Sequence, residues 1–237
     1  MRAGALAAQA VVIAKEPVPG RAKTRLTPPF TPAEAALLAE AALADTLAAV
    51  AAAPVSRHVL ALDGAPGDWL PAGFDVIPQC GGGLDERLAA AFADTHATLP
   101  LPMVLVGMDT PQVTPRLLAD AAGSLTSGEA DAVFGPATDG GFWLLGLRRP
   151  DWSLLAGVPM SRPDTGRHQI DRLTSAGLRV AIAPELTDVD TFREAELIAG
   201  TVPGSRFAAA FGQAMAGWRS ARPRLAGLSL PAWQFTA

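Results

Sequence analysis

Short apolar segments typical of β-strands alternate along this chain with longer segments that have the residue spacing of helices. The expected strands are 11–14, 57–62, 74–77, 103–107, 131–134, 142–147 and 178–183. The expected helices are 32–53, 84–98, one that starts at Pro115, one that is capped by Asp164 or Thr165 and ends before Gly177, and 192–199. Strands that alternate with helices are joined by right-handed crossovers into a mostly parallel sheet that helices cover on both faces. The sequence therefore predicts an α/β fold with three layers.

No Gly/Ser-rich linker or charge run divides residues 1–200, which we expect to form one domain. The segment 201–237 has no clean periodicity, and we expect a helix followed by an arm that packs on the domain or on a partner. Trp218, Trp233 and Phe235 are the aromatic side chains that could make this contact. A homo-oligomer is one form that such a contact could take.

Acidic residues outnumber basic ones by 23 to 19, which gives a formal net charge of -4. This balance argues against nucleic acid or an anionic membrane surface as a partner. The single cysteine, Cys80, excludes an intramolecular disulfide and a cysteine-rich zinc site, so we expect a cytoplasmic location. The apolar stretch 3–14 runs directly into the first strand, and we interpret it as part of the fold rather than a signal peptide. We found no run of about 18 consecutive apolar residues and predict no membrane span.

A cationic loop follows the first expected strand. Lys15, Arg21, Lys23 and Arg25 fall within eleven residues, and two prolines and Gly20 exclude regular structure there. The carboxyl end of a strand in an α/β sheet is where phosphorylated ligands bind, and fixed cations neutralise their charge. We predict that Lys15, Lys23 and Arg25 hold the phosphates of a nucleotide, with Gly20 and Arg21 also in contact. Lys23 and Arg25 would project to the same side of an extended chain. The alternative is a solvated turn.

Asp109 stands where a buried strand ends, just before Pro111. Mg²⁺ and Mn²⁺ prefer oxygen ligands and are usually held by one or two carboxylates together with substrate phosphates. We predict that Asp109 holds such a metal and takes part in the reaction. The alternative is that Asp109 merely caps the turn.

A second acidic segment contains Asp188 and Asp190, separated by Val189. If this segment is extended, both carboxylates face the same way, and one of them could complete the metal site with Asp109. The alternative is that Asp190 or Thr191 caps the helix that follows. Asp190 as the ligand and Thr191 as the cap would satisfy both needs.

Two glycine-rich segments are further candidates for substrate contacts. In one, Asp139 could accept hydrogen bonds from hydroxyl groups while Gly140 and Gly141 allow close approach, although Asp-Gly is also a leading signal for a hairpin turn. In the other, Gly82 belongs to a three-glycine run before a helix, which could cradle an anion or a base.

Gln79 and Arg87 flank the three-glycine run, and we include both with Gly82 as candidate nucleotide contacts. The alternative for Arg87 is an ion pair with Asp85 or Glu86.

Four motifs, in this order, resemble the DUF2064 family of the nucleotide-diphospho-sugar transferase (GT-A) superfamily. They are Lys15-x-Pro17-x-x-Gly20-x-x-Lys23-Thr24-Arg25-Leu26, Gly107-x-Asp109-x-Pro111, Gly135-Pro136-x-x-Asp139-Gly140-Gly141-Phe142 and Asp188-Val189-Asp190-Thr191. The resemblance runs from about residue 8 to residue 199. It implies a three-layer, Rossmann-like GT-A fold with a mostly parallel mixed sheet.

The resemblance also implies roles. Lys15, Lys23 and Arg25 match the phosphate-binding loop, and Asp109 and Asp190 match the metal positions of the superfamily. Members of the family are often labelled glycosyltransferases, and in their loops they are similar to 2-phospho-lactate guanylyltransferase and the molybdopterin nucleotidyltransferases. The chain departs from the pattern in two places. It lacks the Asp-x-Asp of many glycosyltransferases, and it reads Gly-Leu-Asp-Glu-Arg over 83–87 where relatives tend to read Asp-Leu-Gly-x-Arg.

Three functions follow from these motifs. The first is nucleotidyl transfer from a nucleoside triphosphate to a small phosphorylated or otherwise anionic acceptor, with Mg²⁺ or Mn²⁺ and release of pyrophosphate. An acceptor that is already an anion needs no general base, which fits the lack of a candidate histidine. The second is glycosyl transfer from a nucleoside diphosphate sugar. The third is an inactive nucleotide-binding module whose carboxylates serve as caps.

Overall fold

The side chains of β1 (Leu6–Lys15) divide between two cores because successive residues of a strand point to opposite faces of the sheet. Ala8, Ala10, Val12 and Ala14 are buried on one face, and Val11 is buried on the other. Both faces of this strand are covered, which explains why its sequence is an almost continuous apolar run.

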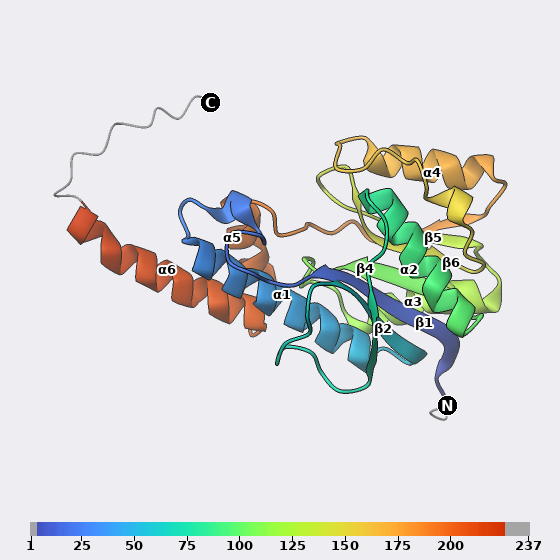
Figure 1. The fold of residues 1–237 in the computed structure, drawn as a ribbon, viewed down its shortest axis with the longest axis horizontal. Coiled ribbons are helices and arrows are strands. Elements are labelled where there is room, and N and C mark those ends of the chain that lie inside the picture. The colour runs from blue at the N-terminus through green and yellow to red at the C-terminus, as the bar shows by residue number, and fades with distance from the viewer. Residues whose placement is uncertain (1–3, 226–237) are drawn as a thin grey trace.

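The sheet has seven strands in the order β3-β2-β1-β4-β6-β5-β7 in this computed structural model, which describes residues 4–225 (Figure 1). The other strands are β2 (Val55–Asp63), β3 (Phe74–Pro78), β4 (Met103–Gly107), β5 (Ala132–Pro136), β6 (Phe142–Leu147) and β7 (Val180–Ile182). β6 runs antiparallel to β4 and β5, and the other neighbouring strands are parallel. The predicted mostly parallel mixed sheet is confirmed.

Helices cover both faces of the sheet. They are α1 (Pro32–Ala52), α2 (Leu84–Thr98), α3 (Pro115–Ser127), α4 (Thr165–Ser175), α5 (Phe192–Thr201) and α6 (Arg206–Leu225). Residues of α1 and α3 form the core on one face, and residues of α2 and α4 form the core on the other. A third cluster joins α1, α5 and α6 beside the sheet. The predicted three-layer α/β architecture is confirmed.

Local signals start the helices as expected. The hydroxyl of Thr31 accepts from the amide of Glu34 at 3.2 Å, and the Glu34 carboxylate accepts from the amide of Thr31 at 2.8 Å, which forms a capping box. Thr114 caps α3 by accepting from the amide of Leu117 at 3.2 Å. In each helix a proline occupies the first turn, where its missing N–H costs nothing.

The predicted strand 178–183 is wrong in its length, because β7 contains only three residues. The amide of Leu178 donates to the carbonyl of Leu173 at 3.2 Å, so this residue still closes the end of α4. Two short 3-10 helices, Thr24–Leu26 and Trp152–Leu154, were not expected from the sequence.

The expected helix in the C-terminal segment is present as α6, whereas Trp233 and Phe235 lie outside the described residues. By length and composition alone, α1 is the one helix of the described chain that could cross a membrane. Most of its apolar window, 61%, is buried inside the protein, which is typical of a core helix.

Candidate functional site

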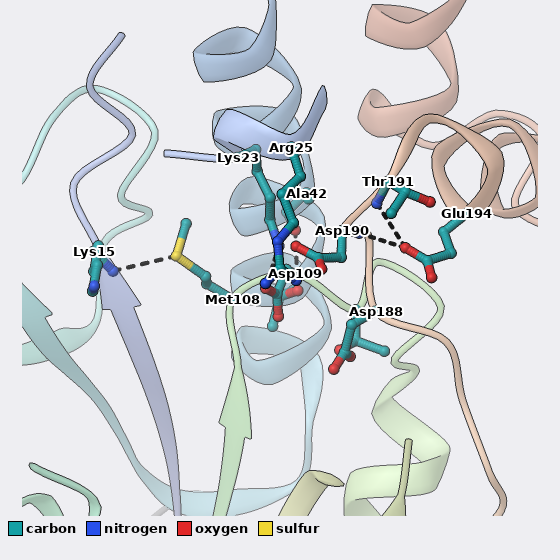
Figure 2. Close-up of polar contacts among 12 residues, drawn as sticks. Lys15, Lys23, Arg25, Ala42, Met108, Asp109, Asp188, Asp190, Thr191 and Glu194 are labelled. Atoms are coloured by element: carbon teal, nitrogen blue, oxygen red, sulfur yellow. Dashed lines mark hydrogen bonds and ion pairs between the residues drawn. The ribbon is translucent and has the colours of Figure 1, made fainter. Parts of the chain in front are cut away.

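Lys23 contacts Asp109 at the carboxyl end of β4. Its ammonium group donates a hydrogen bond to a carboxylate oxygen of Asp109, which joins the cationic loop after β1 to the segment after β4 (Figure 2). The Lys23 side chain is only 11% exposed and that of Asp109 is 29% exposed. A pair so shielded from water interacts more strongly than an ion pair on the open surface. The structure thus brings together one predicted phosphate-binding cation and one predicted metal ligand.

Arg25 contacts Asp190 in the same way, with more exposure to solvent. Its guanidinium donates to a carboxylate oxygen of Asp190, and the two side chains are 75% and 40% exposed. Figure 2 shows that Lys23 and Arg25 come from one loop and meet carboxylates from two other segments of the chain. Asp190 raises the pKa of Arg25 through this hydrogen bond and through its negative charge.

The expectation of an extended chain between Lys23 and Arg25 is wrong. Lys23 has a left-handed backbone with φ of 49°, and a 3-10 helix spans Thr24–Leu26. The tight turn buries Leu26 completely in the cluster between α1, α5 and α6. Burial of this one apolar side chain therefore decides the shape of the loop, and the two cations reach different carboxylates.

Asp188 lies beside Asp109. Burial and the negative charge of Asp109 raise the pKa of Asp188 to about 7, although a hydrogen bond from Thr110 and the charge of Lys23 oppose this shift. The hydroxyl of Thr110 donates to Asp188 at 2.6 Å. Asp139 raises the pKa of Asp188 further through its own negative charge. Asp188 and Asp109 thus form a pair of carboxylates that repel each other.

The segment that carries Asp188 and Asp190 is held in place by its backbone. The amide of Val189 donates to the carbonyl of Asp109 at 2.9 Å, and the Val189 side chain is buried. The side chains on either side of Val189 meet different partners, Thr110 for Asp188 and Arg25 for Asp190, and their common direction stays a prediction.

Thr191, and not Asp190, caps α5. The Glu194 carboxylate accepts from the amide of Thr191 at 2.7 Å and from that of Asp190 at 3.1 Å. The Asp190 side chain is therefore not used as the cap, and it pairs with Arg25 instead.

Asp139, Gly140 and Gly141 form the hairpin turn between β5 and β6. Asp139 accepts from the amide of Gly141 at 2.8 Å. Gly140 has φ of +87°, and a Cβ atom there would lie 1.9 Å from the carbonyl oxygen of Pro163. The turn lies next to the acidic segment, because the amide of Thr138 donates to the carbonyl of Leu186 at 3.0 Å. This position favours a substrate contact by Asp139, which stays a prediction.

Gln79 and Arg87 are engaged within the fold. The Gln79 amide donates to the carbonyls of Ala14 at 2.6 Å and Ala61 at 3.0 Å, and so ties β1 to β2. Arg87 forms an ion pair with Asp63 at 3.4 Å, and the expected alternative of Asp85 or Glu86 is wrong.

Neighbouring side chains also form hydrogen bonds with the three-glycine run before α2. The amide of Gly82 donates to Glu86 at 2.8 Å, and Arg87 donates to the carbonyl of Gly82 at 3.3 Å. Asp85 accepts from the amide of Gly157 at 2.8 Å, from a different part of the chain. The partners of Asp85 and Arg87 lie in distant parts of the chain. The spacing of neighbouring residues therefore gave the wrong partners, Asp85 and Glu86, for Arg87.

Lys15, Gly20 and Arg21 do not join the two ion pairs. Figure 2 shows Lys15 apart from the group around Asp109, with its amide directed at the sulfur of Met108 at 3.2 Å. Gly20 has φ of +76°, with no atom near the position of a Cβ, and Arg21 is exposed.

Two further residues support the site through hydrogen bonds: Thr110 donates to Asp188, and Glu194 accepts from the amides of Asp190 and Thr191. Thr110 was not recognised in the sequence, because a single threonine after Asp109 forms no pattern.

A comparison with models of known protein families shows to which family this chain belongs. The family model described as "Uncharacterized protein conserved in bacteria (DUF2064)" matches residues 38–162, which is more than half of the 237 residues. The chain belongs to the DUF2064 family. Among proteins with curated descriptions, none matches the sequence.

Two solved structures are similar to this DUF2064 protein. One, from Desulfovibrio desulfuricans G20, is provisionally assigned as a nucleotide-diphospho-sugar transferase; it is 25% identical over 90% of this chain and 97% of its own, with a TM-score of 0.80. The other is Rv0371c from Mycobacterium tuberculosis H37Rv, which is 21% identical over 82% of this chain and 97% of its own, with a TM-score of 0.50. The Desulfovibrio protein has the same fold as this chain over nearly its whole length. This fold is that of the nucleotide-diphospho-sugar transferases.

Proposed function

We propose that this DUF2064 protein is a metal-dependent nucleotidyltransferase. The observation that carries the proposal is the meeting of Lys23 with Asp109 and of Arg25 with Asp190 at one edge of the sheet. Two cations and several carboxylates at one place suit a ligand that combines phosphates with a divalent cation. The similarity to the Desulfovibrio protein supports a transferase that uses a nucleotide donor.

The carboxylates fit Mg²⁺ or Mn²⁺. Within residues 4–225 no group of three or more His, Cys, Asp or Glu side chains could hold a metal by itself. A magnesium ion, however, usually takes only one or two carboxylates and completes its shell with phosphates and water. Asp109 and Asp188 would supply this pair, because their mutual repulsion is relieved by a cation between them. The metal would act as a Lewis acid on the bound phosphates.

Asp190 is the third candidate ligand, and its contact with Arg25 gives it a different task in our proposal. Arg25 and Lys23 are positioned by Asp190 and Asp109 until a nucleotide binds. The phosphates then share these cations with the carboxylates. Lys15, at the start of the same loop, would contact the outer phosphates.

In the proposed reaction an oxygen of the anionic acceptor attacks the α-phosphorus of a nucleoside triphosphate. The new P–O bond forms as the bond between the α-phosphorus and the bridging oxygen breaks, and pyrophosphate leaves with the electron pair. Lys23 and Arg25 neutralise the charge that develops on the transferring and leaving phosphates. The attacking oxygen is already ionised, so no side chain has to accept a proton.

Glycosyl transfer from a nucleoside diphosphate sugar is the second candidate. The provisional assignment of the Desulfovibrio protein as a nucleotide-diphospho-sugar transferase favours it. In that reaction the same cations would hold the diphosphate, and Asp139 in the hairpin turn would contact the sugar or the acceptor.

The test compares the two donors directly. Pyrophosphate release is measured with Mg²⁺, each nucleoside triphosphate and a set of phosphorylated small acceptors, and binding of nucleoside diphosphate sugars is measured in parallel by calorimetry. We expect metal-dependent release of pyrophosphate and loss of both binding and release in Asp109→Asn. Asp120→Asn, on the exposed surface of α3, is the matched control. Metal-dependent binding of diphosphate sugars without triphosphate binding would support the second candidate and refute the first.

A further inference from the structure

A groove of about 700 Å³ lies between α1, α6 and the loop 64–73, and none of its lining residues belongs to the site described above. It is lined by Glu34, Leu37, Glu40, Ala41, Ala44, Asp68, Trp69, Pro71, Arg206, Ala210, Gln213 and Ala214. The groove therefore combines an apolar floor with charged side chains.

The charged side chains of the groove are mostly acidic. Glu34, Glu40 and Asp68 face a single cation, Arg206. Neither Glu40 nor Asp68 forms an ion pair with another described side chain. Beside them the side chain of Leu37 is 60% exposed and presents apolar surface to the groove. A segment that presents arginines and large apolar side chains would match this surface.

α6 packs antiparallel to α1 along the groove. At one end Asp45 accepts from the amides of Arg206 at 3.1 Å and Phe207 at 2.8 Å. At the other end a Cβ atom on Gly217 would lie 3.6 Å from the Glu34 carboxylate. α6 then continues to Leu225, about 12 Å further, and this end extends beyond the rest of the molecule (Figure 1).

Residues 219–237, which we call the arm, have the matching chemistry in their sequence. The arm contains Arg219, Arg222 and Arg224 and no acidic residue. Its apolar side chains include Leu228, Leu230, Trp233 and Phe235.

The arm is a poor match for the groove of its own molecule. Positions 222 and 224 of α6 lie about 8 and 11 Å past Gly217 along the helix axis, in the direction that leads away from Glu40 on α1. Residues 226–237 contain no basic residue. The groove of another molecule has no such restriction.

We infer that two copies of this chain form a dimer in which the arm of each copy lies in the acidic groove of the other. Opposite charges attract across the contact, while Leu37 and Trp69 receive apolar side chains of the arm. The same pair of surfaces is used twice, as in a two-fold symmetric dimer.

The test measures the mass of the full-length protein in solution by light scattering during size-exclusion chromatography. We expect twice the mass of one chain. Glu40→Lys with Asp68→Lys reverses the groove, and Arg219→Glu with Arg222→Glu reverses the arm. Each double variant alone should have a dimer dissociation constant at least about tenfold higher, because like charges then meet.

An equal mixture of the two double variants should restore the dimer, because each reversed arm then meets a reversed groove and each native arm a native groove. Asp94→Lys with Glu129→Lys makes the same change of charge on exposed residues outside the groove and should leave the dimer unchanged. A monomeric full-length protein overturns the inference. A dimer that either double variant leaves intact, or that the mixture fails to restore, overturns it as well.

Discussion

The ammonium group of Lys23 donates a hydrogen bond to the carboxylate of Asp109, 86 positions further along the chain. The contact joins the loop after β1 to the end of β4, two strands that are neighbours in the sheet. It places a cation and a carboxylate where an α/β sheet binds its ligands, beyond the carboxyl ends of the strands.

Replacement of Lys23 should weaken nucleotide binding more than it weakens the fold. A charge-assisted hydrogen bond to a phosphate contributes about 1.5–3 kcal/mol, so Lys23→Ala should raise the dissociation constant of a triphosphate with Mg²⁺ by about 10- to 100-fold. Titration calorimetry measures this change. Lys23→Arg, which keeps the charge, should bind more tightly than Lys23→Ala. Arg116→Ala, on the exposed surface of α3, is the control. Unchanged affinity in Lys23→Ala would remove this residue from the phosphate site.

Asp188 should make the stability of the protein depend on pH. Its pKa is raised to about 7 in the folded state from an ordinary value of 3.8, so the folded protein binds the proton more tightly than the unfolded chain does. The resulting stabilisation is complete below about pH 4 and is lost as the pH rises to about 7. Above that pH, the ionised carboxylate is unfavourable in the folded state.

Asp188→Asn keeps an acceptor for the Thr110 hydroxyl and removes the titrating group. Urea unfolding between pH 4 and pH 8 should therefore show the variant gaining stability over the native protein as the pH rises. Asp94→Asn, on an exposed part of α2, should show no such trend. Parallel curves for Asp188→Asn and the native protein would contradict the shift.

Gly140 should tolerate no side chain. Alanine there would place Cβ 1.9 Å from the carbonyl oxygen of Pro163 and would require a left-handed backbone. We expect Gly140→Ala to lower the free energy of unfolding by more than about 3 kcal/mol or to prevent folding. Gly20→Ala has a similar positive φ but no neighbouring atom within 4 Å, and should cost only about 1–2 kcal/mol. Equal effects in the two variants, measured by urea unfolding, would show that the contact with Pro163 is unimportant.

Asp45 should anchor the start of α6. Its carboxylate accepts from two backbone amides, those of Arg206 and Phe207, that no helical carbonyl can satisfy. Asp45→Ala should destabilise the protein by about 1–2 kcal/mol, the usual cost of a lost cap, and should speed hydrogen exchange at both amides. Asp45→Asn retains one acceptor oxygen and should have a smaller effect. Slow exchange at both amides in Asp45→Ala would contradict the anchoring role.

Some parts of the site were predictable because they depend on residues close together in the chain. The hairpin turn at Asp139 and the cap of α5 by Thr191 are signalled by neighbours within a few positions. The strand ends of β1 and β4 also follow from the apolar pattern. Hence the order of strands and helices in the sequence indicated that the cationic loop and Asp109 would lie at the same edge of the sheet.

Other features required the whole fold. Burial of Leu26 turns the basic loop into a 3-10 helix, and this separates the partners of Lys23 and Arg25. Arg87 finds Asp63 on a neighbouring strand rather than the acids next to it on its own helix.

The amino-acid order alone thus decides the alternation of strands and helices, their caps and the turn at Gly140, because these are set by backbone preferences and by the period of apolar residues. Only the tertiary structure decides which carboxylate each cation meets and which aspartate lies next to Asp109. Those outcomes depend on burial and charge between segments that are far apart in the chain, and no local pattern records them.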